Sequence, residues 1–328
     1  MSPEVSMREA YGKTLVELGE ENQDIVVLDA DLCRSTMTKF FASEFPGRFF
    51  DCGIAEQNMV VIAAGLAASG KIPFASTFAV FVPGRCFDQI RMSIAQPRLN
   101  VKLVSTHGGI SVGEDGTSHQ TIEDLALICS LPGFNVVVPA DAIEAAQAVK
   151  AAAANYGPFY IRLCRPKTPL LYNQNHHFKL GKAVTMRKGT NTTIIAIGLM
   201  VAEALKAAEN LKRKGIDCRV LNMSTLKPID EAAIIKAAAE TGAIVTVEEH
   251  LEHGGLGSTV ARVVARHQPV PMEFVAIKDT YAESGKFTEL LQKYGLVAKD
   301  IEQAVRRVIK RVGAGSGTRT HKDCSGGF

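Results

Sequence analysis

A chain of 328 residues, 46% of them hydrophobic, is long enough to bury the cores of two globular domains. The formal net charge of +3 is too small to indicate a nucleic-acid partner, and no basic stripe interleaved with aromatic residues is present. The apolar runs are too short to span a membrane, and residues 1–13 lack the apolar core of a signal peptide. We therefore expect a cytoplasmic protein without a nucleic-acid or membrane partner.

The chain begins with alternating helical and strand-like segments. Each strand-like segment is short, apolar and followed by a polar or glycine-containing turn. Strands are predicted over residues 25–31, 48–52, 72–77, 101–106, 135–139 and 159–163. Helices are predicted over residues 7–21, 57–69, 84–95 and 141–154. This alternation predicts a mostly parallel sheet flanked by helices, which we assign to a first α/β domain over residues 1–165.

A polar, proline-containing segment over residues 166–180 is typical of a linker. The alternation then resumes over residues 181–312, which predicts a second α/β domain of the same kind. Its strands are expected over residues 192–198, 218–224, 243–249 and 272–277. Residues 313–328 are rich in glycine and serine without periodicity, so we expect a disordered tail.

The cysteines indicate free thiols. There are seven, an odd number, and no two have the C-x-x-C spacing of thiolate metal sites. They lie at Cys33, Cys52, Cys86, Cys129, Cys164, Cys218 and Cys324.

Chemically useful side chains follow the predicted strands of the first domain. In open parallel sheets, ligands bind at the carboxyl ends of the strands, so these loops are candidate site segments. The fourth loop, residues 106–120, contains several glycines, which allow backbone and side chains to approach a small ligand closely. The candidates in these loops are Asp31, Ser35, Glu56, Phe78, Phe81, His107, Asp115, His119 and Arg165.

Each candidate also has an interpretation without function. Taken alone, Glu56 is better explained as a favourable charge at a helix start, and Phe78 and Phe81 as core residues. His107, Asp115 and His119 resemble a metal triad in composition, but the glycines between them exclude the helical spacing of such ligands. The segment 248–258, "EEHLEHGGLGS", is a weak candidate anion site or metal cluster, and we interpret it as a solvated turn.

Four motifs together are more specific than any single residue. They are "GIAEQNM" (53–59), "STFAVF" (76–81), "STHGGISVGEDGTSHQ" (105–120) and "YIRLCRP" (160–166). With these motifs, the first domain resembles the pyrimidine-binding domain of transketolase, and residues 181–312 resemble the C-terminal domain of that family. Deoxyxylulose-phosphate synthases, a sister family, have an Asp-Arg pair in place of Thr106-His107, and the beta subunits of 2-oxo acid dehydrogenases have a different histidine loop.

The resemblance implies thiamine diphosphate as the cofactor. Glu56 matches the glutamate that hydrogen-bonds a ring nitrogen of the aminopyrimidine, where a desolvated carboxyl can share a proton. Phe81 matches the aromatic residue that stacks on the ring, with Phe78 beside it, and Asp31 matches an aspartate near the cofactor. The sequence departs from the family at Gly84, where many transketolases have a further aromatic residue.

The resemblance also implies a sugar phosphate substrate and assigns a role to each residue that would bind it. Asp115 matches a residue that reads a substrate hydroxyl, and His119 one near the reacting carbonyl. Glu56, His107 and His119 are the implied catalytic residues. Arginine suits a phosphate dianion because its guanidinium can donate two parallel hydrogen bonds. The implied phosphate ligands are Arg8, Ser35, His107 and Arg165.

One expected motif is missing. Thiamine diphosphate enzymes hold the diphosphate through Mg²⁺ with a G-D-G motif and a downstream asparagine, and this sequence contains no G-D-G. We therefore expect the chain to be the C-terminal subunit of a split transketolase, which transfers a two-carbon ketol unit only with a separate diphosphate-binding subunit. The Mg²⁺ ligands would come from that subunit, and the chain would self-associate to a dimer within an α2β2 assembly. The alternatives are a subunit of another thiamine diphosphate enzyme and a non-catalytic homologue.

Overall fold

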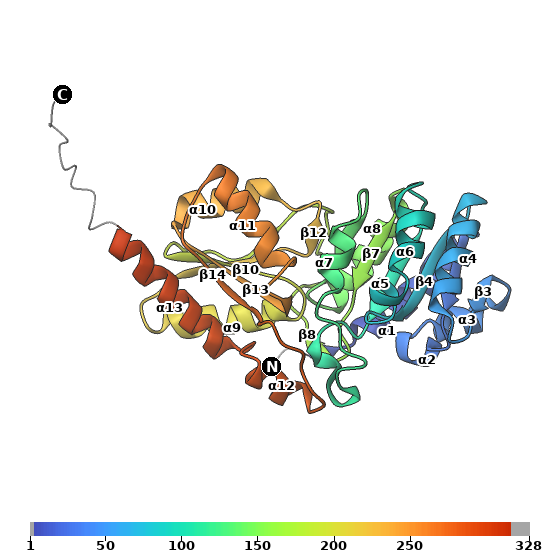
Figure 1. The fold of residues 1–328 in the computed structure, drawn as a ribbon, viewed down its shortest axis with the longest axis horizontal. Helices are drawn as coiled ribbons and strands as arrows, with labels where there is room; N and C mark the ends of the chain where they lie inside the picture. The colour runs from blue at the N-terminus through green and yellow to red at the C-terminus, as the bar shows by residue number, and fades with distance from the viewer. Residues whose placement is uncertain (1–2, 316–328) are drawn as a thin grey trace, which may run out of the picture.

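The computed structural model describes residues 3–315, which contain two parallel sheets, each flanked by helices (Figure 1). The predicted α/β fold class is therefore confirmed. The first sheet has seven strands in the order β12-β6-β7-β5-β4-β2-β3, and all but β12 run parallel. Its strands are β2 (Ile25–Asp29), β3 (Phe49–Asp51), β4 (Ile72–Phe78), β5 (Lys102–Thr106), β6 (Asn135–Val137), β7 (Phe159–Arg162) and β12 (Thr225–Lys227).

The second sheet has five strands in the order β14-β13-β10-β11-β9, with only β9 antiparallel to its neighbour. These strands are β9 (Val184–Arg187), β10 (Thr192–Ala196), β11 (Cys218–Asn222), β13 (Ile244–Leu251) and β14 (Met272–Ile277). Strand β12 follows β11 in the chain but pairs antiparallel with β6 of the first sheet. The second half of the chain therefore contributes a strand to the first sheet, which the sequence analysis did not anticipate.

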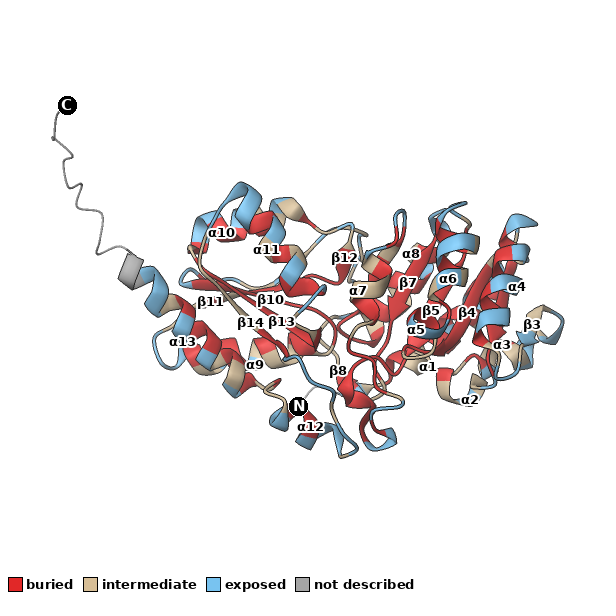
Figure 2. Cartoon of the chain, viewed as in Figure 1, coloured by how far each residue is buried: buried red, intermediate tan, exposed pale blue. Residues whose placement is uncertain are grey.

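Most strands are buried, β3 at the edge of the first sheet being an exception, and most helices have an exposed outer face (Figure 2). On one side of the first sheet lie α1 (Met7–Glu21), α3 (Lys39–Glu44) and α8 (Ala142–Ala154), and α4 (Glu56–Ala68) lies on the other. Alternation along the strands divides the core, since Val27 packs with α1 while its neighbour Leu28 packs with α4. Both faces of the sheet are therefore covered, as a parallel sheet requires.

Helix α1 shows how local sequence sets an element. The Ser6 side chain accepts a hydrogen bond from the backbone N–H of Glu9 at 3.3 Å and so caps the helix start. Met7, Tyr11 and Leu15 follow at intervals of four residues and are all buried. This helix lies as predicted, and its first turn carries Arg8 toward the carboxyl ends of the strands.

Other helices complete the layers. Helix α9 (Met200–Lys212) and helix α13 (Ala298–Gly315) cover one face of the second sheet, and α10 (Glu231–Thr241) and α11 (Leu256–His267) cover the other. The short helical segments are α2 (Cys33–Thr36), η1 (Pro46–Arg48), η3 (Ile110–Asp115), α7 (Asp124–Cys129) and α12 (Phe287–Lys293). No helix within residues 3–315 is long and apolar enough to cross a membrane.

Three predicted segments differ in detail. The helix expected over 84–95 is divided into α5 (Val82–Arg85), α6 (Phe87–Gln89) and a π-helical turn, η2 (Ile90–Ala95), because Cys86 has a non-helical backbone. Within the predicted linker, β8 (Thr168–Pro169) pairs antiparallel with β1 (Glu4–Val5). Helix α13 continues to Gly315, into the segment expected to be disordered, and the rest of that segment lies outside the described residues.

Candidate active site

The sheet topology brings the predicted site loops to one edge. Strands β7, β5, β4 and β2 are neighbours in that order and run parallel. The loops that follow them carry Arg165, His107, Phe81 and Asp31, respectively. The carboxyl ends of parallel strands meet at one edge of a sheet, so these loops converge there.

Glu56 is the first residue of α4 and is only 6% exposed. Its Oε1 accepts a hydrogen bond from Nη1 of Arg85 at 3.0 Å, in an ion pair whose arginine side chain is 52% exposed. The same guanidinium lies 4.1 Å from the centre of the Phe81 ring. Arg85 therefore contacts both the carboxylate and the aromatic face that the sequence analysis assigned to the cofactor. The sequence analysis did not single out Arg85.

Four rings form a continuous aromatic group beside this ion pair. His107 stacks on Phe78 with centroids 3.8 Å apart, and Phe78 stacks on Phe81 at 5.8 Å. His119 meets the edge of Phe81 at 5.5 Å. The structure thus brings the predicted cofactor residues Phe78 and Phe81 together with the two predicted catalytic histidines.

His107 has a positive φ of 59°, which is uncommon for a residue other than glycine. Its Nδ1 lies 2.8 Å from the Thr106 hydroxyl, and the next residue, Gly108, donates its N–H to the Leu163 carbonyl at 3.1 Å. Burial, reinforced by the charges of Arg8 and Arg165, lowers the pKa of His107 to about 3. The imidazole is therefore neutral at physiological pH and can donate one N–H to a ligand.

Three of the predicted phosphate ligands lie together on one side of His107. Arg8 donates from Nη1 to the Ser35 carbonyl at 2.8 Å and from Nη2 to the Arg165 carbonyl at 3.1 Å. Arg165 in turn donates from Nη1 to the Val112 carbonyl. Both arginines line a cavity of about 500 Å³, which Lys167 and Lys286 also line. The carboxylates of Glu4 and Glu114 line it too, so the four cationic side chains outnumber the acidic ones, as suits an anion site.

Asp31 and Asp115 are both exposed. The backbone N–H of Asp31 donates to Oδ1 of Asp51 at 3.1 Å, and Asp115 ends the short helix η3. Behind them, the buried carboxylate of Asp29 accepts hydrogen bonds from Leu32 N–H at 2.7 Å and from the Thr36 hydroxyl at 2.7 Å. Burial raises the pKa of Asp29 to about 6. Asp29 therefore orders the turn that carries Ser35. In the sequence, Asp29 is recognisable only as an acidic residue at the end of a buried strand.

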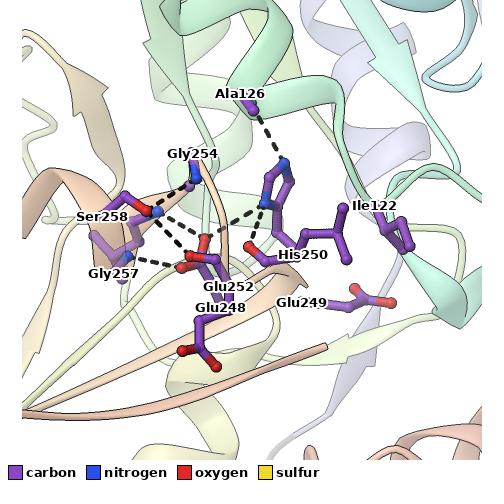
Figure 3. Close-up of polar contacts among 12 residues, drawn as sticks. Ile122, Ala126, Glu248, Glu249, His250, Glu252, Gly254, Gly257 and Ser258 are labelled. Carbon is purple, nitrogen blue, oxygen red and sulfur yellow. Dashed lines mark hydrogen bonds and ion pairs between the residues drawn. The ribbon is translucent and has the colours of Figure 1, made fainter. Parts of the chain in front are cut away.

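The solvated turn expected over 248–258 is a wrong interpretation for its first three residues. Glu248, Glu249 and His250 are at most 3% exposed, because β13 continues to Leu251 and these side chains meet α11, η3 and α7, respectively. Glu248 accepts hydrogen bonds from the N–H groups of Leu256 and Gly257 at 2.7 Å each, and so holds the start of α11 (Figure 3). Within residues 3–315, no group of three His, Cys, Asp or Glu side chains is placed to hold a metal ion.

The residues around Glu56 fit the pyrimidine end of thiamine diphosphate. A planar ring with hydrogen-bonding nitrogens needs an aromatic face and a carboxylate at its edge, and Phe81 and Glu56 provide both. In the structure, the Arg85 guanidinium, which is also planar and rich in hydrogen-bond donors, contacts both the Glu56 carboxylate and the Phe81 ring. This fit concerns the pyrimidine end of the cofactor.

Comparison with known proteins agrees with this fold. The model of the transketolase pyrimidine-binding domain matches residues 3–169, and that of the transketolase C-terminal domain matches residues 181–301. A protein of Methanocaldococcus jannaschii, named as a transketolase C-terminal section, is 45% identical over 93% of this chain and 96% of its own length. The 6-deoxy-6-sulfo-D-fructose transketolase subunit of Clostridium sp. strain MSTE9 is 42% identical over 93% of this chain and 95% of its length.

A solved structure, described as a split gene transketolase in an inactive beta4 tetramer, is 51% identical. The two structures superpose with a TM-score of 0.88, and the match covers 93% of this chain and 99% of the solved chain. Fold and site together define a two-domain α/β protein whose first domain is of the pyrimidine-binding class. The chain belongs to the transketolase family, and its similarity to separate transketolase sections and subunits extends over almost their whole length.

Proposed function

We propose that the chain is the C-terminal subunit of a split transketolase, which transfers a two-carbon ketol unit from a ketose phosphate to an aldose phosphate. The observation that carries this proposal is a half-site: Glu56 and Phe81 fit the pyrimidine end of thiamine diphosphate, next to a cationic cavity lined by Arg8 and Arg165. Its relatives of similar length are named as transketolase sections and subunits, which supports the same assignment.

Thiamine diphosphate, when bound, supplies the carbanion stabilisation that cleavage and formation of carbon–carbon bonds require. In this proposal Glu56 holds a proton against a pyrimidine nitrogen from a site with little solvent access. Phe81 fixes the plane of the ring, and Phe78 packs behind it. Asp31, at the neighbouring strand end, completes the side of the site that faces the cofactor.

On the substrate side, the guanidinium groups of Arg8 and Arg165 bind the anionic end of the sugar. Ser35 holds Arg8 through its carbonyl. Neutral His107 donates a hydrogen bond without adding charge. The exposed carboxylate of Asp115 reads a sugar hydroxyl, and His119, at the edge of the Phe81 ring, donates to the reacting carbonyl oxygen.

The diphosphate and Mg²⁺ would be held by the partner subunit. The surface beside Glu56 supports a covered interface there, because Ile54 is 78% exposed and Val61 on the outer face of α4 is 46% exposed. We propose that the diphosphate-binding subunit covers this surface, and that two copies of each chain form an α2β2 assembly.

The test is an assay of the chain with its partner subunit, thiamine diphosphate and Mg²⁺. Ketol transfer from a ketose phosphate to an aldose phosphate is the expected result. Since one relative is named for a sulfonated ketose, and a sulfonate is also an anion that Arg8 and Arg165 would bind, a sulfonated donor belongs in the same assay. Decarboxylation of a 2-oxo acid without ketol transfer would instead assign the chain to another thiamine diphosphate enzyme, and no turnover in either assay would favour a non-catalytic homologue.

A further inference from the structure

The segment from Thr106 to Gln120, here called the substrate loop, contacts both domains. It carries His107 near its start, and Asp115 and His119 near its end, so its conformation sets the distance between the proposed phosphate and hydroxyl ligands. Its short helix η3 begins at Ile110, directly after two glycines. We asked what holds this helix in place.

The carboxylate of Glu249, from β13 of the second domain, reaches the start of η3. Its Oε1 accepts a hydrogen bond from the backbone N–H of Ser111 at 2.5 Å, and its Oε2 accepts one from the Ser111 hydroxyl at 3.2 Å. All of these groups are buried, Glu249 being 3% and Ser111 2% exposed. Hydrogen bonds to a buried carboxylate are stronger than bonds between neutral groups, so this contact fixes one turn of the loop.

The lack of a side chain at Gly109 leaves room for the same Glu249 carboxylate. A Cβ atom added to Gly109 would lie 2.2 Å from the carboxyl carbon of Glu249, and the residue has a positive φ of 83°. The carboxylate therefore packs directly against the backbone of the loop. Gly108, one residue earlier, faces Arg162 in the same way, with an added Cβ 2.4 Å from Nε. The loop passes between a carboxylate of one domain and a guanidinium of the other.

Glu249 is itself held rigidly. Nη2 of Arg162 donates to the Glu249 carbonyl at 3.0 Å, and Nε of Arg162 pairs with Asp124 at 2.9 Å. The neighbours of Glu249 on β13 are directed elsewhere: Glu248 to the start of α11, and His250 to the Ala126 N–H at 3.4 Å (Figure 3). Glu249 is the member of this trio that reaches the substrate loop.

The far end of the loop also rests on the second domain. The Thr117 hydroxyl donates to the Ala282 carbonyl at 2.8 Å, and Gln120 Nε2 donates to the Glu283 carbonyl at 2.9 Å. These bonds follow Asp115 in the chain, whereas Glu249 acts between His107 and Asp115. The loop is thus attached to the C-terminal domain on both sides of Asp115.

We propose that Glu249 is a positioning residue for the substrate loop, through which the C-terminal domain sets the placement of Asp115 relative to His107. Glu249 itself does not touch the substrate. The role given to the loop rests on the proposed function, but the mechanical role of Glu249 does not. Through Glu249, the C-terminal domain would contribute to substrate recognition.

The test compares Glu249→Ala with Glu248→Ala in the full chain. Each removes a buried carboxylate from β13 that accepts two hydrogen bonds, but Glu248 holds α11 and not the loop. By hydrogen exchange, Glu249→Ala should speed amide exchange over residues 108–116 by about tenfold or more, since each hydrogen bond to a charged group is worth that factor. Glu248→Ala should speed exchange over 254–259 instead. Unchanged exchange over 108–116 in Glu249→Ala would overturn the proposal.

A second arm uses the enzyme reconstituted with the diphosphate-binding subunit, with xylulose 5-phosphate as donor and ribose 5-phosphate as acceptor. Glu249→Ala should raise the acceptor KM by about ten- to a hundredfold, because misplacing a ligand by about 1 Å can cost about a hundredfold. Glu248→Ala should leave KM unchanged, and Glu249→Gln should approach wild type, because the amide oxygen still accepts from the Ser111 N–H. An equal KM change in both alanine variants would reduce Glu249 to a purely structural residue.

If Glu249→Ala does not fold, Ser111→Ala decides the matter. It removes only the hydroxyl donor and should raise the acceptor KM in the same direction by a smaller factor, while an unchanged KM overturns the proposal. If the wild-type pair shows no ketol transfer, the proposed function fails, and the hydrogen-exchange arm still decides whether Glu249 holds the loop.

Discussion

The replacement Glu56→Gln separates the chemical role of this carboxylate from its structural role. In the structure Glu56 starts α4 and pairs with Arg85, whose side chain is 52% exposed. Because one partner of this ion pair is half-exposed, the pair contributes about 0.2–1 kcal/mol, and a negative charge at a helix start contributes about 0.3–1 kcal/mol. The variant should therefore lose at most about 2 kcal/mol of stability, and its melting temperature should fall by only a few degrees.

The effect on turnover should be much larger. An amide cannot share a proton with a pyrimidine nitrogen, and a positioned acid or base contributes roughly 10²–10⁴-fold to a rate. We expect kcat of the reconstituted enzyme to fall by about that factor, as followed in a coupled ketol-transfer assay. The matched control is Glu231→Gln, which neutralises the first residue of α10, near Arg262 at 3.8 Å and outside the site, and should leave kcat unchanged.

Near wild-type kcat in Glu56→Gln, with the fold intact, would show that Glu56 is only a helix-start charge. That was the interpretation of this residue taken alone.

Three further predictions address neighbouring groups. Arg165→Ala should raise KM for sugar phosphates more than for unphosphorylated glycolaldehyde-like substrates. An equal rise in KM for both substrate classes would mean that Arg165 has a structural role, through its hydrogen bond to the Val112 carbonyl. His107 should stay neutral in an NMR titration down to about pH 4, because its pKa is lowered to about 3, and a transition near pH 6.5 would refute this. The stability that the neutral imidazole provides is fully present above the unfolded-state pKa of about 6.5, and it is lost as the pH falls toward 3. Arg85→Ala should tighten thiamine diphosphate binding, measured by calorimetry, by roughly 5- to 30-fold. In the variant, the ion pair with Glu56 and the cation–π contact with Phe81, worth about 1–2 kcal/mol in total, no longer compete with the cofactor. Weaker binding would mean that Arg85 assists the ligand.

Local pattern predicted much of the framework. Helix α1 follows from a serine cap and an apolar repeat of four residues, and the strands of the first sheet from short β-branched runs with alternating burial. Because the carboxyl ends of parallel strands share an edge, the convergence of His107, Phe81 and Arg165 could be predicted before their distances were known.

Contacts between distant segments could not be predicted in this way. The Ser111 to Glu249 bond joins residues 138 positions apart. The sequence predicts a strand as far as Glu249, but nothing in "VEEHLEHGG" shows that it continues through His250 to Leu251, or that Glu248, Glu249 and His250 are all buried. Burial of Glu248, Glu249 and His250 depends on partners supplied by the tertiary fold, namely the α11 amides, the substrate loop and α7. The pairing of β12 with β6 is likewise a tertiary contact, which places this strand in a different sheet from β11, the strand before it in the chain.

The claim at the centre of this account is that the chain holds half of an active site. The direct measurement is ketol transfer by the purified chain, with thiamine diphosphate and Mg²⁺ in excess, before and after addition of the diphosphate-binding subunit, with the assembly mass followed by light scattering. We expect self-association but no transfer by the chain alone, and the simultaneous appearance of cofactor binding, turnover and an α2β2 mass when the partner is added. Robust turnover by the isolated chain would contradict the split site.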